Sequence, residues 1–120
     1  MTKAVISLRT GLEDTESVTV AFLVAVGAAE SGRQTLMFLA KEAVRLMLPG
    51  VATATACRGC PPLEQLIERY RAAGGIYLVC PICVDAKGLM DAPLIEGATK
   101  GGTVQMWEWI GAEGATTFSY

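Results

Sequence analysis

The order of short apolar runs and helical segments restricts the fold of this chain more than any other feature. Its strand-length runs carry little polar alternation, which is typical of strands that are covered on both faces. Strands that alternate with helices indicate an α/β fold with a mainly parallel sheet. The expected strands are residues 4–8, 34–39, 76–79, 94–96 and 116–118, and the expected helices are residues 16–31, 42–48, 63–73 and 102–112.

The segment 16–31 carries the longest helical pattern. Asp14 or Thr15 is placed to cap its start, and Gly32 is placed to end it. One apolar stripe includes Val18 and Phe22, and a second consists of Val20, Leu23 and Val24. A helix that is apolar on two faces is expected to pack on two sides.

The size and composition of the chain predict one domain, residues 1–120, with part of its surface buried in an oligomer. Hydrophobic residues make up 52% of the 120 residues. A small domain has much surface relative to its volume and should carry more polar residues than this. The two tryptophans, Trp107 and Trp109, are expected in the core or at a subunit interface. We therefore expect a homo-oligomer.

Charge and hydropathy exclude several kinds of partner. The net charge is −2, and the ten lysines and arginines are scattered, so nucleic acid is not an expected partner. Arg9 interrupts the first apolar run too early for an export signal, and no apolar stretch is long enough to span a bilayer. We expect a cytoplasmic protein without a membrane partner. In a reducing compartment, cysteines are poorer candidates for structural disulfides than for metal binding or catalysis.

The four cysteines form two C-x-x-C pairs, Cys57/Cys60 and Cys80/Cys83. Such spacing fits a zinc site made by all four thiolates. However, the stretch between the pairs holds a full helix and a strand, whereas zinc knuckles occupy tight turns. Three interpretations remain open at this point: thiol chemistry, a four-cysteine zinc site, and unreactive cysteines.

The position of Cys80 favours thiol chemistry. It follows the expected strand 76–79, at the carboxyl edge where open α/β sheets gather their ligands. Pro81 suits the first position of a following helix, whose N–H groups and dipole favour a thiolate. Cys83 is placed to attack a disulfide or persulfide on Cys80, and Lys87 and Arg58 are candidate sources of positive charge.

The absence of histidine narrows the chemistry further. It excludes a Cys-His nucleophile and a mixed Cys/His zinc site. Thiolate activation must then rely on a helix terminus and nearby cations. The glycines at 97, 101 and 102 match no phosphate-binding fingerprint, so no cofactor is expected.

The run Ile76 to Leu89, which contains Cys80-Pro81-Ile82-Cys83 and the Lys87-Gly88 pair, resembles the DsrE/DsrF-like family of sulfur-relay proteins. The resemblance implies a three-layer α/β/α domain and assembly into trimers or hexamers. It also implies that Cys80 accepts sulfane sulfur as a persulfide. The Cys57/Cys60 pair has no counterpart in the family pattern and is a candidate second thiol pair.

The sequence and the resemblance together predict a persulfide carrier of the sulfurtransferase type. Cys80 would take sulfur from a donor protein and pass it to an acceptor protein, and Cys83 would resolve the intermediate. Two alternatives remain: a module in which Cys57, Cys60, Cys80 and Cys83 hold zinc, and a plain dithiol reductase.

Overall fold

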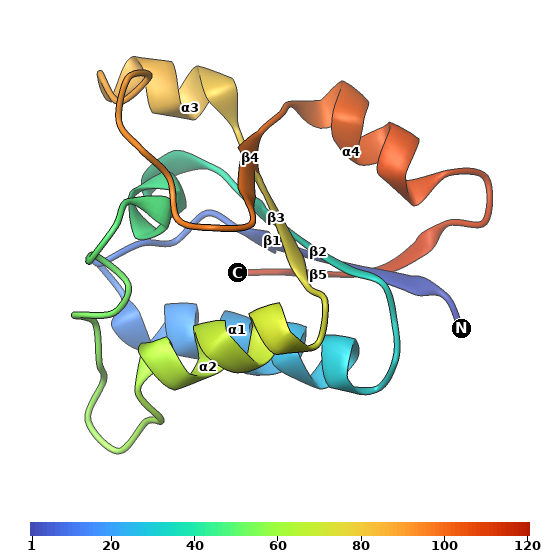
Figure 1. The fold of residues 1–120 in the computed structure, drawn as a ribbon, viewed down its shortest axis with the longest axis horizontal. Coiled ribbons are helices and arrows are strands. Elements are labelled where there is room, and N and C mark those ends of the chain that lie inside the picture. Colours follow the sequence, from blue (N-terminus) through green and yellow to red (C-terminus); the bar gives the residue numbers. More distant parts are fainter.

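The computed structural model describes residues 1–120 and contains one five-stranded sheet in which every pairing is parallel. The strand order is β4-β3-β2-β1-β5 (Figure 1). The strands are β1 (Lys3–Leu8), β2 (Thr35–Leu39), β3 (Ile76–Val79), β4 (Ala98–Lys100) and β5 (Ala115–Ser119). The helices are α1 (Thr15–Glu30), α2 (Leu63–Ala72), α3 (Pro81–Ala86), α4 (Thr103–Ile110) and the 3-10 helix η1 (Lys41–Met47).

The helices form two layers, one on each side of the sheet. Figure 1 shows α1 and α2 on one side of the sheet and α4 on the other. The main core cluster of 22 buried residues joins the sheet to α1, α2 and η1, and α3 packs into the same cluster through Val84. A smaller cluster of Val5, Leu36 and Ile110 lies under α4. The expected three-layer α/β/α fold with a parallel sheet is therefore confirmed.

Helix α1 begins and ends where its sequence predicts. Asp14 is the N-cap and its carboxylate accepts a hydrogen bond from the Ser17 backbone N–H at 3.1 Å. Gly32 follows the helix with φ +93°, a conformation that glycine adopts without strain. The stripe with Val18 and Phe22 is buried, whereas Val20 and Leu23 are exposed. Within one chain, α1 therefore packs chiefly through one of its two apolar stripes.

Three expected elements differ from the structure. The strand expected at 94–96 is a loop, and the fourth strand is β4, which begins at Ala98. In that loop, the backbone N–H of Ile95 donates to Met47 O at 2.8 Å. Leu94 and Ile95 are apolar because they pack against the main core. The helix expected at 42–48 is the 3-10 helix η1, and the last helix is shorter than 102–112. The strand is β4 rather than 94–96 because β4 is the segment that pairs with β3, with Ala98 beside Tyr77.

The two tryptophans of α4 have different environments. Trp109 packs against the smaller core cluster, and the Lys3 ammonium lies 5.2 Å from its ring centre. Trp107 is 66% exposed. None of the helices combines the length and the apolar character needed to cross a membrane.

Candidate functional site

The register of the sheet places Cys80 in a row of residues along its carboxyl edge. The four aligned strands β1, β2, β3 and β4 are followed by Arg9, Ala40, Cys80 and Gly101. The Cys80 N–H continues the ladder by donating to Leu39 O at 2.9 Å. Cys80 therefore lies at the edge where ligands of open α/β sheets bind.

Cys80 is also the N-cap residue of α3. Pro81 occupies the first position of this helix, and the first helical hydrogen bond runs from Val84 N–H to Cys80 O at 3.1 Å. The N–H groups of Ile82 and Cys83 precede that bond and have no partner within the helix. Cys80 is a half-buried free thiol beside the positive end of this short helix.

Cys83 lies in the same helix but in a different environment. It is a half-buried free thiol that packs against the main core cluster. Its neighbour Ile82 is 80% exposed, so the outer side of α3 faces away from the core at this point. The structure therefore brings Cys80 and Cys83 to one helix start and leaves both reduced.

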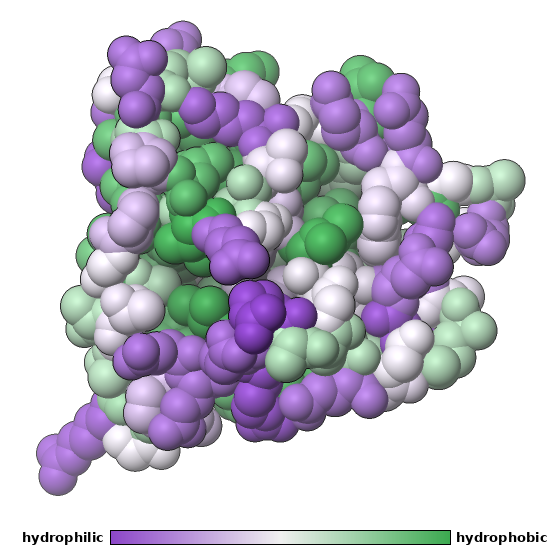
Figure 2. All heavy atoms as spheres, viewed as in Figure 1, coloured by the Kyte–Doolittle hydropathy of each residue, from purple (hydrophilic) through white to green (hydrophobic).

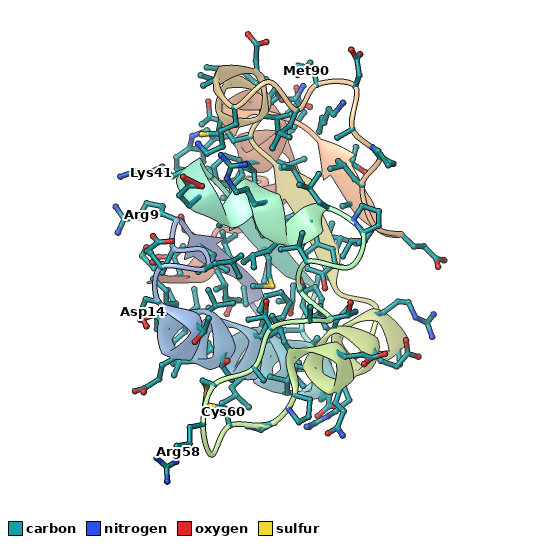
Figure 3. The ribbon with its side chains drawn as sticks, turned by 90° about the vertical axis from the view of Figure 1, so that its left-hand side faces the viewer. Arg9, Asp14, Lys41, Arg58, Cys60 and Met90 are labelled. Carbon is teal, nitrogen blue, oxygen red and sulfur yellow. A yellow bond between two sulfur atoms is a disulfide. The ribbon has the colours of Figure 1, made fainter.

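Two basic residues of the same edge, Arg9 and Lys41, were not identified from the sequence. Arg9 follows β1 directly, and Lys41 comes one residue after Ala40, the neighbour of Cys80 in the row. Both are exposed and extend outward in Figure 3. Lys41 has φ +54°, a left-handed conformation that is uncommon for a residue other than glycine. The signal that would have found them is a basic residue at the end of each of the first two strands.

The two cations expected near Cys80 lie in different places. Lys87 ends α3 and faces η1, where its charge contributes to the lowered pKa of Glu42. The main cause of that lowered pKa is the hydrogen bond from Arg45 to Glu42. Arg58 extends from a loop beside α1 (Figure 3), so the expectation that it supplies charge to Cys80 is wrong.

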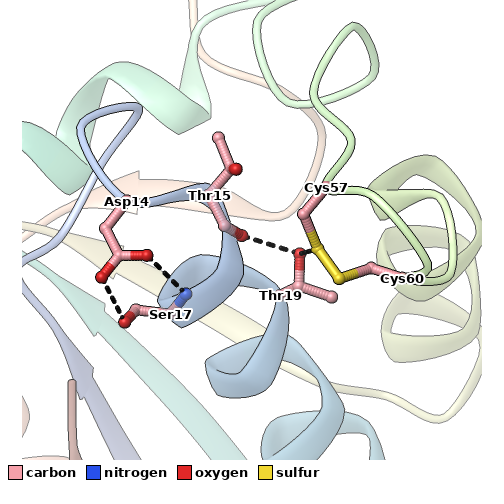
Figure 4. The surroundings of a disulfide bond; sticks show 6 residues. All are labelled: Asp14, Thr15, Ser17, Thr19, Cys57 and Cys60. Atoms are coloured by element: carbon pink, nitrogen blue, oxygen red, sulfur yellow. Dashed lines mark hydrogen bonds between the residues drawn. A yellow bond between two sulfur atoms is a disulfide. The ribbon is translucent and has the colours of Figure 1, made fainter.

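The Cys57/Cys60 pair is closed as a disulfide and lies apart from Cys80. The Cys57 sulfur is 3.5 Å from Thr19 Oγ1 of α1 (Figure 4). The pair therefore packs against α1, whereas α3 packs against η1 at the other end of the molecule, near Met90 in Figure 3. No group of three or more Cys, Asp or Glu residues is arranged to hold a metal ion. The four cysteines thus do not converge on one site, and the zinc alternative has no geometric support.

The hollows of the molecule are separate from the thiols. The most apolar hollow, of about 140 Å³, is lined by the loop 48–53, by α2 and by Tyr77. On the face of the molecule drawn in Figure 2, hydrophobic residues form recessed areas and hydrophilic residues surround them. No cysteine lines any of the four hollows. Cys80 is therefore presented at an open edge rather than inside a pocket.

Comparisons with known proteins agree with this architecture. No protein-family model matches the chain. It is 30% identical to Protein YchN of Escherichia coli over 81 residues, which are 62% of this chain and 69% of that protein. YchN of Shigella flexneri matches equally well.

Solved structures extend the likeness to the whole fold. The crystal structure of E. coli YchN has a TM-score of 0.77 and 26% identity, covering 98% of this chain and all of that one. MTH1491 of Methanobacterium thermoautotrophicum, a protein of unknown function, has a TM-score of 0.70, 12% identity and full coverage of both chains. That second likeness shows a shared fold alone. By its identity and coverage with YchN, the chain belongs to the DsrE/YchN-like family.

Proposed function

We propose that this protein carries sulfane sulfur as a persulfide on Cys80 and passes it to an acceptor protein. The observation that carries the proposal is the position of Cys80, a free and half-buried thiol between a strand end and a helix start. Sulfur carriers need a nucleophilic thiolate that another protein can reach. The open carboxyl edge provides that access.

The geometry supports a reactive thiolate without a histidine base. The chain contains no histidine. The unpaired N–H groups at the start of α3 favour negative charge on the Cys80 sulfur. Arg9 and Lys41 add positive charge to the same edge and would attract an anionic donor.

The proposed transfer balances as a simple exchange. The Cys80 thiolate attacks the outer sulfur of a donor persulfide, R–S–SH. The donor S–S bond breaks, Cys80–S–SH forms, and R–S⁻ leaves. An acceptor thiolate then takes the outer sulfur and restores the Cys80 thiolate. No oxidant or reductant is needed, because one S–S bond breaks for each one that forms.

Cys83 supports a second candidate function, that of a dithiol reductase. Its thiolate can attack the inner sulfur of Cys80–S–SH, which forms a Cys80–Cys83 disulfide and releases HS⁻. The same pair could reduce a protein disulfide without any sulfur transfer. Placement of both free thiols in α3 and its N-cap favours this candidate.

Sulfur loading distinguishes the two functions. In a background with Cys57 and Cys60 replaced by Ser, we expect the Cys83→Ser variant to gain about 32 Da per sulfur when treated with inorganic polysulfide. The Cys80→Ser variant should gain nothing, because it retains only the thiol that packs against the core. Intact-mass spectrometry measures both.

The same pair of variants supplies the controls. Thermal unfolding should show that both variants remain folded, since neither half-buried thiol makes a hydrogen bond that Ser would lose. Loading of Cys80→Ser at an undiminished rate would refute the role of Cys80. A Cys83→Ser protein that forms mixed disulfides but never holds sulfur would favour the dithiol reductase.

A further inference from the structure

We propose that Cys57 and Cys60 form a second thiol–disulfide exchange site, independent of Cys80, whose reaction partner is the dithiol or disulfide of a redox protein. The site is the disulfide itself together with Thr19 of α1, the residue that the Cys57 sulfur contacts (Figure 4). The disulfide packs against α1, and Figure 3 shows Cys60 at the opposite end of the molecule from Met90, which follows α3, so the two thiol pairs would act separately.

The disulfide is accessible to a protein partner. Its two intervening residues, Arg58 and Gly59, are exposed, and both cysteines are half-buried. Figure 3 shows Arg58 at the far end of the loop, pointing away from the molecule. A partner thiolate can therefore approach the sulfur atoms from solvent, which a disulfide inside the core would not allow.

The disulfide adds little that the fold requires. Cys57 and Cys60 are three positions apart, and a backbone hydrogen bond from Cys60 N–H to Cys57 O at 3.1 Å already holds the turn. Gly59, with φ +79°, gives the turn its left-handed residue. A cross-link that closes so short a ring restricts the unfolded chain less than one that closes a long loop. A redox role explains the pair better than a structural one.

Thr19 makes the two sulfur atoms unequal. Thr19 is 2% exposed, and its hydroxyl donates to Thr15 O at 2.8 Å. The hydroxyl oxygen therefore faces the Cys57 sulfur with its lone pairs, at 3.5 Å. A disulfide sulfur carries no hydrogen, but after reduction the Cys57 S–H can donate to this oxygen. That hydrogen bond would keep reduced Cys57 protonated and leave Cys60 as the attacking thiolate.

The exchange then follows one order. The Cys60 thiolate attacks a partner disulfide, so a Cys60–partner bond forms and the partner's other sulfur leaves as a thiolate. Cys57 loses its proton to solvent and attacks the Cys60 sulfur, which forms the Cys57–Cys60 bond and releases the second partner sulfur. The partner gains two electrons and this site loses two. The reverse order oxidises a partner dithiol.

Glutathione buffers test the site in a protein that carries Cys80→Ser and Cys83→Ser. We expect the Cys57–Cys60 bond to open and close reversibly across the range from fully oxidised to fully reduced glutathione. Trapping with an alkylating reagent and intact-mass measurement gives the fraction closed. Because this protein lacks Cys80, the result does not depend on the sulfur-carrier proposal.

Thr19→Val tests the assignment of the two sulfurs. Removal of the oxygen should favour the closed form by about threefold, since S–H is a weak donor whose bond is lost only from the reduced state. Thr19→Ser should restore the original equilibrium. Thr35→Val is the matched control, because Thr35 is also 2% exposed and donates to a backbone carbonyl, that of Arg33, far from any sulfur.

Peptide mapping of the glutathione adduct completes the test. The mixed disulfide should be found on Cys60. The proposal is wrong if the disulfide stays closed, or never closes, at every glutathione ratio. The proposed order, in which Cys60 attacks first, is wrong if the adduct lies on Cys57. It is also wrong if Thr19→Val and Thr35→Val shift the equilibrium between the open and closed disulfide equally.

Discussion

Two tyrosines are buried in the core, and they differ in whether the hydroxyl has a hydrogen-bond partner. The Tyr70 and Tyr77 rings lie 5.1 Å apart at an angle of 51°. The Tyr70 hydroxyl is within hydrogen-bond distance of Thr35 O and Ile76 O, at 3.1 and 2.7 Å. The Tyr77 hydroxyl has no partner. Burial raises the pKa of both phenols well above the ordinary value, so both stay neutral at physiological pH.

The two tyrosines should therefore respond in opposite ways to the loss of their hydroxyl. Tyr70→Phe leaves buried carbonyls without a donor and should lower the free energy of unfolding by about 1–3 kcal/mol. Tyr77→Phe removes an unpaired buried hydroxyl and should leave that free energy unchanged or raise it. Urea unfolding measures both variants. An equal loss in Tyr77→Phe would instead show that a buried water pairs with this hydroxyl.

At the scale of elements, the N-terminus of α1 depends on a charged cap. The Ser17 hydroxyl donates to the Asp14 carboxylate at 2.7 Å, and the Ser17 backbone N–H donates at 3.1 Å. These two hydrogen bonds lower the pKa of Asp14, the side-chain bond having the larger effect. The folded pKa is thus below the unfolded one. The cap's contribution is fully present above the unfolded pKa and is lost as pH falls through the folded pKa.

The pH dependence of stability tests this cap. Asp14→Ala should lower the melting temperature at neutral pH, because the first turn of α1 loses its acceptor. The difference from the original protein should shrink as the pH falls through the folded pKa of Asp14. Asp14→Asn keeps an acceptor without titrating and should show a smaller, pH-independent difference. If Asp14→Ala lowered the melting temperature by the same amount at every pH, the charge of the Asp14 carboxylate would not contribute to the cap.

The whole molecule leaves apolar groups exposed along one side. Strand β5 is an edge strand, and its Phe118 lines a hollow together with Val24 and Ala28 of α1. Leu23 of the same helix is 42% exposed. Exposed apolar groups beside an unpaired sheet edge are typical of a surface that another chain covers. We propose that a second copy of the chain covers it, which would account for the second apolar stripe of α1.

Sedimentation velocity should therefore give a mass above that of one 12.7 kDa chain. Leu23→Asp should reduce the mass toward that of a single chain, because it places a charge in the proposed interface. Met90→Asp is the matched control, since Met90 is also 42% exposed but lies after α3 at the other end of the molecule (Figure 3). A single-chain mass for the unaltered protein at low micromolar concentration would refute the assembly.

Most of the fold could be predicted from the sequence because its signals are local. Hydrophobic runs place β1, β2 and β3 within one or two residues of their bounds. Asp14 and Gly32 mark the ends of α1, since capping and left-handed turns depend on one or two residues. Pro81 likewise marks the start of α3, and with it the position of Cys80 after β3. These features need no knowledge of distant parts of the chain.

The remaining features depend on contacts between distant segments. The sequence could not separate Ile95 from a strand, because an apolar residue packs equally well from a loop, and only pairing with β3 defines β4. Identical C-x-x-C spacing could not show that Cys57 packs against α1 while Cys80 lies at the start of α3, because tertiary packing decides which loops meet. The strand order places Lys41 beside the Cys80 row. Local chemistry thus determined the elements and the candidate nucleophile, and the tertiary structure decided which residues surround it.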